Sequence, residues 1–93
     1  MREIEYTSRF RRDYKRLFRG QHRGTLDAAL GAVIGALVRD EPLAARYRDH
    51  PLGGEWVGFR DCHVKPDLVL IYQKPDENTL RLVRLGSHSE LGW

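Results

Sequence analysis

The sequence has one cysteine, Cys62, and no long hydrophobic run. A single cysteine excludes an internal disulfide framework and fits the reducing cytoplasm. The longest apolar stretch, residues 28–38, is too short to span a bilayer, and the charged first residues do not resemble a secretory signal. Repeats, linkers and low-complexity segments are also lacking. The 93 residues, 41% hydrophobic and 31% charged, therefore predict one soluble cytoplasmic domain over residues 1–93, with no membrane partner.

Positive charge is concentrated in the first half of the chain. Residues 1–48 contain eleven Lys and Arg against six Asp and Glu, whereas residues 49–93 contain five against seven. Between Arg9 and Arg23 there are seven cations and one acid, Asp13. This density exceeds what a solvated helix surface requires, so it indicates a polyanion or an acidic protein as a partner. Charge alone does not distinguish the two.

The first 40 residues are predicted to form a strand and two helices. Residues 2–7 alternate as a strand does, and Ser8 is expected to cap a helix that runs from Arg9 to Arg19. Thr25 is expected to cap a second helix that ends at Arg39. Gly31 and Gly35 in this second helix would allow another helix to approach closely.

The rest of the chain is predicted to form strands joined by tight turns, over residues 56–64, 68–72 and 79–85. The middle segment is uniformly apolar, which is typical of a buried central strand. The order of elements predicts an α+β domain, in which two N-terminal helices pack on a small, mainly antiparallel, four-stranded sheet.

Three of the four histidines lie in the strand-rich half, at His50, His63 and His88. Imidazole changes its charge near neutral pH, and RNA cleavage through the 2′-hydroxyl needs a base, an acid and a cation at the phosphate. A tight turn would bring His63 near Asp67, and Arg84 lies on the strand that leads to His88. In a basic protein, this combination favours acid–base chemistry on an RNA phosphate.

Several of these residues also have structural interpretations. Trp56 and Tyr72 are predicted to be core residues, and Arg60 could pair with Asp61 or Asp67. An aspartate in a Pro-Asp turn can cap that turn through its own backbone. His22 is expected to be exposed in a loop. No pair of candidate ligands has a recognised zinc spacing, so we predict no metal and no cofactor.

Two blocks of sequence resemble the YafQ group of RelE-type toxins, which belong to bacterial type II toxin–antitoxin systems. The first is the run His-Pro-Leu-Gly-Gly-x-Trp-x-Gly-Phe-Arg-x-x-His-Val-x-Pro-Asp within residues 47–72, and the second contains Arg-Leu-Gly-Ser-His within residues 81–91. The resemblance implies a RelE-like fold and an mRNA endonuclease that works in the A site of the 70S ribosome without a metal. It also implies a cognate antitoxin whose chain wraps the toxin and blocks its site, and binding of operator DNA only through the toxin–antitoxin complex.

The resemblance assigns catalytic roles to His50, His63, Asp67, Arg84 and His88. His88 or His63 would be the principal acid or base, and Asp67 would orient it or act as the base. Arg84 would stabilise the phosphate, while His50 would position the RNA. Further RNA-binding residues are predicted at Arg60, Lys65, Arg81, Trp93, Arg11, Arg12, Lys15, Arg16 and Arg19.

The C-terminus departs from the family pattern. Gly92 occupies the position at which family members tend to carry an aromatic residue, and Trp93 follows one residue later. Two other functions remain open: an RNA- or ribosome-binding inhibitor of translation that does not cut, and a partner-bound regulatory module of the same fold. Replacing His88 by alanine should abolish toxicity only if the protein is an enzyme.

Overall fold

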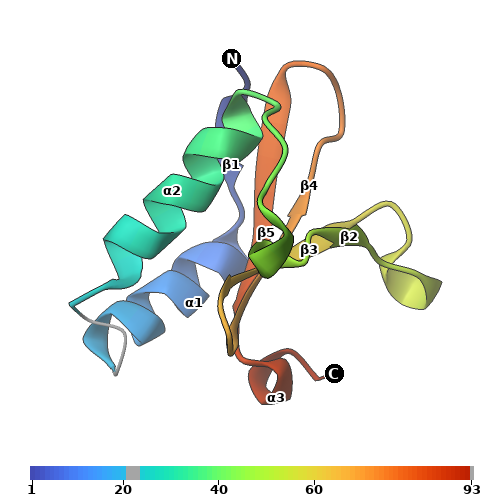
Figure 1. The fold of residues 1–93 in the computed structure, drawn as a ribbon. Coiled ribbons are helices and arrows are strands. Elements are labelled where there is room, and N and C mark those ends of the chain that lie inside the picture. Colours follow the sequence, from blue (N-terminus) through green and yellow to red (C-terminus); the bar gives the residue numbers. More distant parts are fainter. Residues whose placement is uncertain (21–23, 93) are drawn as a thin grey trace.

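The computed structural model describes residues 1–20 and 24–92 and confirms the α+β class. Two helices, α1 (Ser8–Arg19) and α2 (Leu26–Val38), lie on one side of the sheet (Figure 1). The strands are β1 (Glu3–Tyr6), β2 (His50–Pro51), β3 (Arg60–Lys65), β4 (Leu68–Gln73) and β5 (Thr79–Gly86). Their order in the sheet is β1-β5-β4-β3-β2, and only the β1–β5 pair is parallel. Three short helices complete the fold: η1 (Ala45–Tyr47), η2 (Gly54–Trp56) and α3 (His88–Leu91).

The predicted count of four strands was wrong, because the sheet has five. β2 is only two residues long and includes a proline, so neither alternation nor β propensity reveals it. The strand predicted over residues 56–64 begins only at Arg60, since Gly54–Trp56 forms a 3₁₀ turn instead. α3 has four residues, too few for a helical period, and sequence analysis missed it.

The predicted helices are confirmed with small shifts at their ends. Thr7, and not Ser8, caps α1, because its Oγ1 accepts the Phe10 N–H at 3.2 Å. Thr25 stands at the N-cap of α2, but its side chain makes no capping hydrogen bond. The predicted positions His22, Arg23 and Trp93 lie outside the described residues.

The core lies between the two helices and the sheet. β4 is the central strand, and residues 68–72 are all buried, as predicted. Phe10 and Leu17 of α1, together with Leu30 and Val33 of α2, close the core on the helical side. Tyr72 is buried as predicted, whereas Trp56 is only partly buried, so the prediction that Trp56 belongs to the core was wrong.

The prediction that Gly31 and Gly35 serve a close helix–helix approach was also wrong. A Cβ atom at Gly31 would have nothing within 4 Å, and one at Gly35 would meet only the Arg39 side chain near the end of α2. The space beside Gly31 is instead part of a surface groove. Within the two described ranges, no helix is long and apolar enough to cross a membrane.

Candidate functional site

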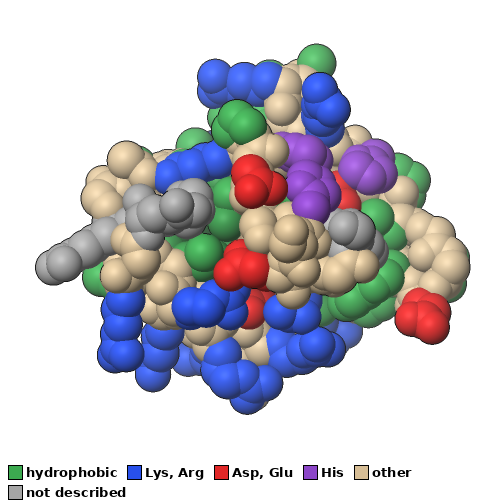
Figure 2. Space-filling model, turned by 90° about the horizontal axis from the view of Figure 1, so that it is seen from below, with side chains coloured by type: hydrophobic (Ala, Val, Ile, Leu, Met, Phe, Trp, Pro, Cys, Tyr) green, Lys and Arg blue, Asp and Glu red, His purple; other side chains and the backbone are tan. Residues whose placement is uncertain are grey.

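Three predicted site residues meet at one end of the sheet. The rings of His63 and His88 have their centroids 5.2 Å apart, and His88 Nδ1 lies 3.3 Å from Asp67 Oδ1. Strand pairing explains the meeting, because His63 pairs with Val69 of β4 and Val69 pairs with Gly86 of β5. In Figure 2 the histidine side chains gather on one face of the molecule, between two groups of Lys and Arg side chains.

His88 is fixed by its position at the start of α3. Ser87 caps this helix: its side chain accepts the Glu90 N–H at 3.1 Å, and the Glu90 carboxylate accepts the Ser87 N–H at 2.8 Å. A carboxylate can only accept a hydrogen bond, so the contact with Asp67 places a proton on Nδ1 of His88. The Nε2 atom is then the nitrogen that can exchange a proton with a substrate.

His50 lies on β2, opposite Asp61 of β3. Its Nδ1 atom is 2.7 Å from the Arg48 carbonyl oxygen and 3.2 Å from Asp61 Oδ1. One N–H cannot serve both acceptors well, and the carbonyl is nearer. Asp61 Oδ1 is accordingly buried without a hydrogen-bond donor. Nδ1 of His50 therefore carries a proton, and its Nε2 is the nitrogen that can exchange one.

Asp61 is the residue that sequence analysis missed as part of this site. Its side chain is nearly buried, and burial raises the pKa of its carboxyl group, although charged forms of His50, His63 and His88 act to lower that pKa. The period-two alternation of a strand places Asp61 and His63 on the same face, and this signal could have identified it. Asp61 is thus a buried carboxylate that all three site histidines influence.

Arg84, predicted to contact the phosphate, is bound to Asp13 of α1. Its Nε donates to Asp13 Oδ2 at 2.8 Å and its Nη2 to Oδ1 at 3.3 Å. Asp13 also accepts the Leu85 N–H and a bond from Arg16. Burial raises the pKa of Asp13, but these partners, with Arg84 foremost, outweigh it and hold the pKa below its usual 3.8.

Arg16 extends this ion-pair network to α3, because its Nε lies 3.2 Å from Glu90 Oε2. Glu90 is also the capping residue of the helix that carries His88. The chain Arg84–Asp13–Arg16–Glu90 therefore connects β5, α1 and α3. Arg16 acts here as a structural link, whatever it contributes to RNA binding.

The other predicted RNA-binding residues of the second half lie at different places. Arg60 pairs with Asp49 instead of the expected Asp61 or Asp67, and Tyr72 also donates to Asp49, next to His50. Arg81 pairs with Glu5 and Gln73, five residues before Gly86 on β5 and so roughly 16 Å from the histidine end. Lys65 contacts Thr25 and lines the same pocket as His63 and His88.

The cations of α1 do not form one continuous surface. Arg11 lies over the Tyr6 ring, 5.3 Å from its centroid, and Lys15 follows one turn later. Both line a groove of about 650 Å³ between α1 and α2, whereas Arg16 faces α3. Arg12 and Arg19 are exposed to solvent.

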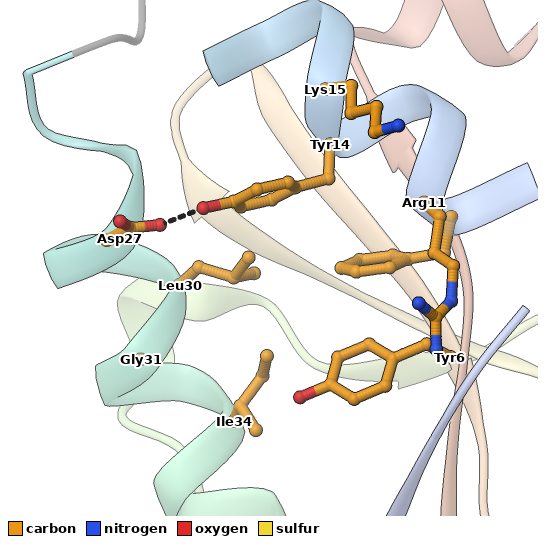
Figure 3. Close-up of a pocket in the computed structure, with 9 residues that line it drawn as sticks. Tyr6, Arg11, Tyr14, Lys15, Asp27, Leu30, Gly31 and Ile34 are labelled. Atoms are coloured by element: carbon orange, nitrogen blue, oxygen red, sulfur yellow. Dashed lines mark hydrogen bonds between the residues drawn. The ribbon is translucent and has the colours of Figure 1, made fainter.

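Aromatic rings dominate this α1–α2 groove. Tyr6, Phe10 and Tyr14 line it in a row with centroid distances of 6.0 and 6.4 Å, and Phe18 continues this row 5.8 Å from Tyr14. Figure 3 shows Leu30 and Ile34 of α2 on the facing side, with Gly31 between them, and the Tyr14 hydroxyl donating to Asp27. The groove is therefore apolar inside, with Arg11 and Lys15 at its border.

Metal binding was predicted to be absent. Among the described residues, no group of three or more His, Cys, Asp or Glu side chains has a geometry that could hold a metal ion. Cys62 is fully buried, and burial raises the pKa of its thiol, so its sulfur is not arranged as a ligand or nucleophile.

Comparison with known proteins gives consistent matches over nearly the whole chain. The model of the family described as "Bacterial toxin of type II toxin-antitoxin system, YafQ" matches residues 2–92. The mRNA interferase toxin YafQ of Escherichia coli K12 is 41% identical over 91 residues, which cover 97% of this chain and 95% of that protein.

Two solved structures are similar as well. A metal-bound toxin from Helicobacter pylori is 51% identical with a TM-score of 0.86, and the match covers 98% of this chain and 99% of that one. The Escherichia coli DinJ–YafQ complex contains a chain that is 39% identical, with a TM-score of 0.82 and 98% coverage of both chains.

Proposed function

The chain belongs to the YafQ family of toxins from bacterial type II toxin–antitoxin systems, and from this premise we propose that it is an mRNA interferase, an endoribonuclease that inhibits translation. It acts in the cytoplasm on mRNA in the A site of the 70S ribosome. The observation that carries the proposal is the group of His63, Asp67 and His88, with ring centroids 5.2 Å apart and a 3.3 Å contact to the carboxylate. Two imidazoles beside one another suit acid–base catalysis, and binding alone would not require them.

The reaction proceeds by attack of the RNA on itself. One imidazole removes the proton of the 2′-hydroxyl, the 2′-oxygen attacks the phosphorus, and the bond from phosphorus to the 5′-oxygen breaks. The other imidazole enters protonated and gives its proton to that 5′-oxygen. The products are a 2′,3′-cyclic phosphate and a 5′-hydroxyl, so the step balances without a metal or a cofactor.

The geometry supports distinct roles for the remaining residues. Asp67 orients His88 by accepting its Nδ1–H, which turns Nε2 toward the substrate. Arg84 supplies positive charge to the phosphate, but it does so as a residue already held by Asp13, not as a freely moving clamp. His50 positions the RNA through its Nε2.

The test is to map the 5′ ends of mRNA on programmed ribosomes. We expect new ends within codons with the wild type, and about 10²- to 10⁴-fold fewer with His88→Ala, since that is the usual contribution of an acid–base group. Ser89→Ala, an exposed neighbour, is the matched control and should cut normally. Stalled ribosomes with intact mRNA in the wild-type reaction would instead indicate an inhibitor that does not cut.

A second arm of this experiment tests metal independence, because the Helicobacter pylori relative binds a metal. The protein is treated with EDTA, and the chelator is removed before the ribosomes are added, since ribosomes need magnesium. Full activity is expected after this treatment. Loss of activity that zinc or copper restores would contradict the metal-free mechanism.

A cognate antitoxin neutralises the toxin, as the DinJ–YafQ complex suggests for the Escherichia coli relative. We assign its contact to the α1–α2 groove, because the aromatic interior fits the apolar side of an amphipathic segment and Arg11 and Lys15 fit acidic residues at its border. Operator DNA is bound only by the toxin–antitoxin complex. An antitoxin segment that protects none of the groove residues from hydrogen exchange would contradict this assignment.

A further inference from the structure

A second and larger pocket opens beside the catalytic histidines. It has a volume of about 1060 Å³ and lies between α2, η1 and the turn from β3 to β4. His63 and His88 both line it, so a substrate at the two imidazoles is continuous with the pocket. Ligand pockets usually measure roughly 300–1,000 Å³, and this one therefore has room for at least one nucleotide.

The sequence of α2 explains why this space is open. Ala28 and Ala32 are one helical turn apart, line the pocket and are exposed. Alanine is the best helix former, and its single methyl group fills little space. Longer side chains at these two positions would keep the helix but occupy the pocket.

The wall of the pocket around η1 carries two cations. Arg46 and Arg48 line the pocket from η1 and its C-terminal end, and both side chains are exposed. The Arg46 guanidinium lies 4.8 Å from the centroid of the Tyr47 ring and donates to the Tyr47 hydroxyl at 2.8 Å, so its position is defined. A planar guanidinium matches the oxygen atoms of a phosphate.

Arg48 also connects this wall to the catalytic residues. Its backbone has a φ of 49°, in the left-handed region that non-glycine residues rarely adopt. In that conformation its carbonyl oxygen accepts the Nδ1–H of His50 at 2.7 Å. Arg48 thus positions His50 through its backbone while its own side chain lines the pocket. Such strained backbone conformations are concentrated at functional sites.

From these contacts we propose that the pocket is a binding subsite for single-stranded RNA, occupied by the nucleotide next to the cleaved phosphate and held at its other phosphate by Arg46 and Arg48. The subsite rests on the proposed function for its role in cleavage. An acidic protein segment would also meet these cations, but RNA is favoured because the two imidazoles of the candidate site line the same pocket.

The first experiment measures binding without cleavage. The isotope-labelled protein is titrated, at millimolar concentration, with a short RNA whose 2′-hydroxyls are replaced by hydrogen, and the amide signals are followed by NMR. We expect the amides of Ala28, Ala32 and Tyr47 to shift. Shifts confined to α1, or no shifts at all, would contradict the subsite. It would also be contradicted if an acidic peptide shifted these amide signals and the RNA did not.

Substitutions then test the two arginines. Arg46→Gln with Arg48→Gln should weaken binding about tenfold or more. The slope of log K against log salt concentration should also fall by about 0.7, since a single strand releases about 0.7 counterion per neutralised phosphate and both arginines hold the same phosphate. Arg46→Lys with Arg48→Lys should retain most of the salt dependence, since lysine keeps the positive charge.

The matched control removes two cations elsewhere, by Arg39→Gln with Lys74→Gln. Both are paired with acidic residues near the C-terminal ends of α2 and β4. This variant should bind RNA like the wild type. If it and the Arg46/Arg48 variant lose equal affinity, net charge and not a subsite explains the binding, and the proposal fails.

Cleavage on ribosomes separates this proposal from the proposed function. If the RNA titration gives the expected pattern while the wild type cuts no mRNA, the result supports the subsite and contradicts the interferase assignment. If the wild type cuts mRNA and Arg46→Gln with Arg48→Gln changes neither RNA binding nor cleavage, the result supports the interferase assignment and contradicts the subsite.

Discussion

Helix α2 separates two grooves that differ in chemistry although both have cations at their borders. On one side, Gly31 lines the groove with Tyr6, Phe10 and Tyr14. On the other side its neighbour, Ala32, lines the pocket with His63 and His88. The first groove can bury apolar area, while the second presents two imidazoles. In our proposal, similar surface charge serves protein binding at the first groove and chemistry on RNA at the second.

The largest expected effect comes from removing a catalytic imidazole. His63→Ala should lower cleavage on ribosomes by about 10²- to 10⁴-fold, because an acid or base is lost from the reaction. Affinity for the antitoxin should stay within about twofold of the wild type, since His63 lies in the other groove. Equal losses in both assays would mean that the two grooves form a single binding surface.

Asp13 and Tyr14 are neighbours on α1 and provide a comparison of stability. Asp13→Ala should lower the free energy of unfolding by about 3 kcal/mol, because it leaves Arg84 partly buried without its partner. Tyr14→Phe removes only an exposed hydrogen bond to Asp27 and should cost less than about 1 kcal/mol. Urea unfolding of both variants measures the difference.

The pH dependence of unfolding gives a second readout for Asp13. Its pKa is lower in the folded protein than the usual 3.8, so it contributes stability that is present above that value and is lost as the pH falls through the folded pKa. The loss of stability in acid should be shallower in Asp13→Ala than in the wild type. Identical slopes would show that Asp13 is not the responsible group.

Substitutions at adjacent positions of α2 distinguish the two grooves directly. Gly31→Leu should weaken antitoxin binding about tenfold by filling the aromatic groove, while cleavage is unchanged. Ala32→Leu should weaken RNA binding about tenfold and spare the antitoxin. Both variants place leucine, a good helix former, in α2, so thermal unfolding serves as the control. A reversed pattern would exchange the two functional assignments.

Among the site residues, the smallest effect is expected at Asp61. Its pKa is raised in the folded state mainly by burial, so the ionised form opposes folding, and this contribution lowers stability as the pH rises through the raised pKa. Asp61→Asn should increase the free energy of unfolding at neutral pH by about 1 kcal/mol and reduce cleavage. A variant that is less stable at pH 7 would contradict the inference that the ionised Asp61 carboxylate destabilises the folded protein.

Local sequence patterns were sufficient for the large elements. The bounds of α1 and the uniformly apolar residues 68–72 follow from short-range patterns, and both were predicted closely. β2 and α3 were not, because they have two and four residues and are stabilised by pairing with β3 and by the Ser87–Glu90 cap. These two short elements carry His50 and His88, so sequence reasoning was weakest where the site is built.

The sequence by itself determined which residue types are available for chemistry: three histidines beside carboxylates, and an excess of cations. Which of them meet was decided only by the tertiary structure. Strand register joins His63 to His88 and His50 to Asp61, and the buried Asp13 takes Arg84 and Arg16. The physical reason is that these contacts link residues up to 71 positions apart, between Asp13 and Arg84. Local propensity carries no information about such pairs. A charge that is buried without a partner costs free energy, and this cost favours the fold in which Asp13 meets Arg84 and Arg16.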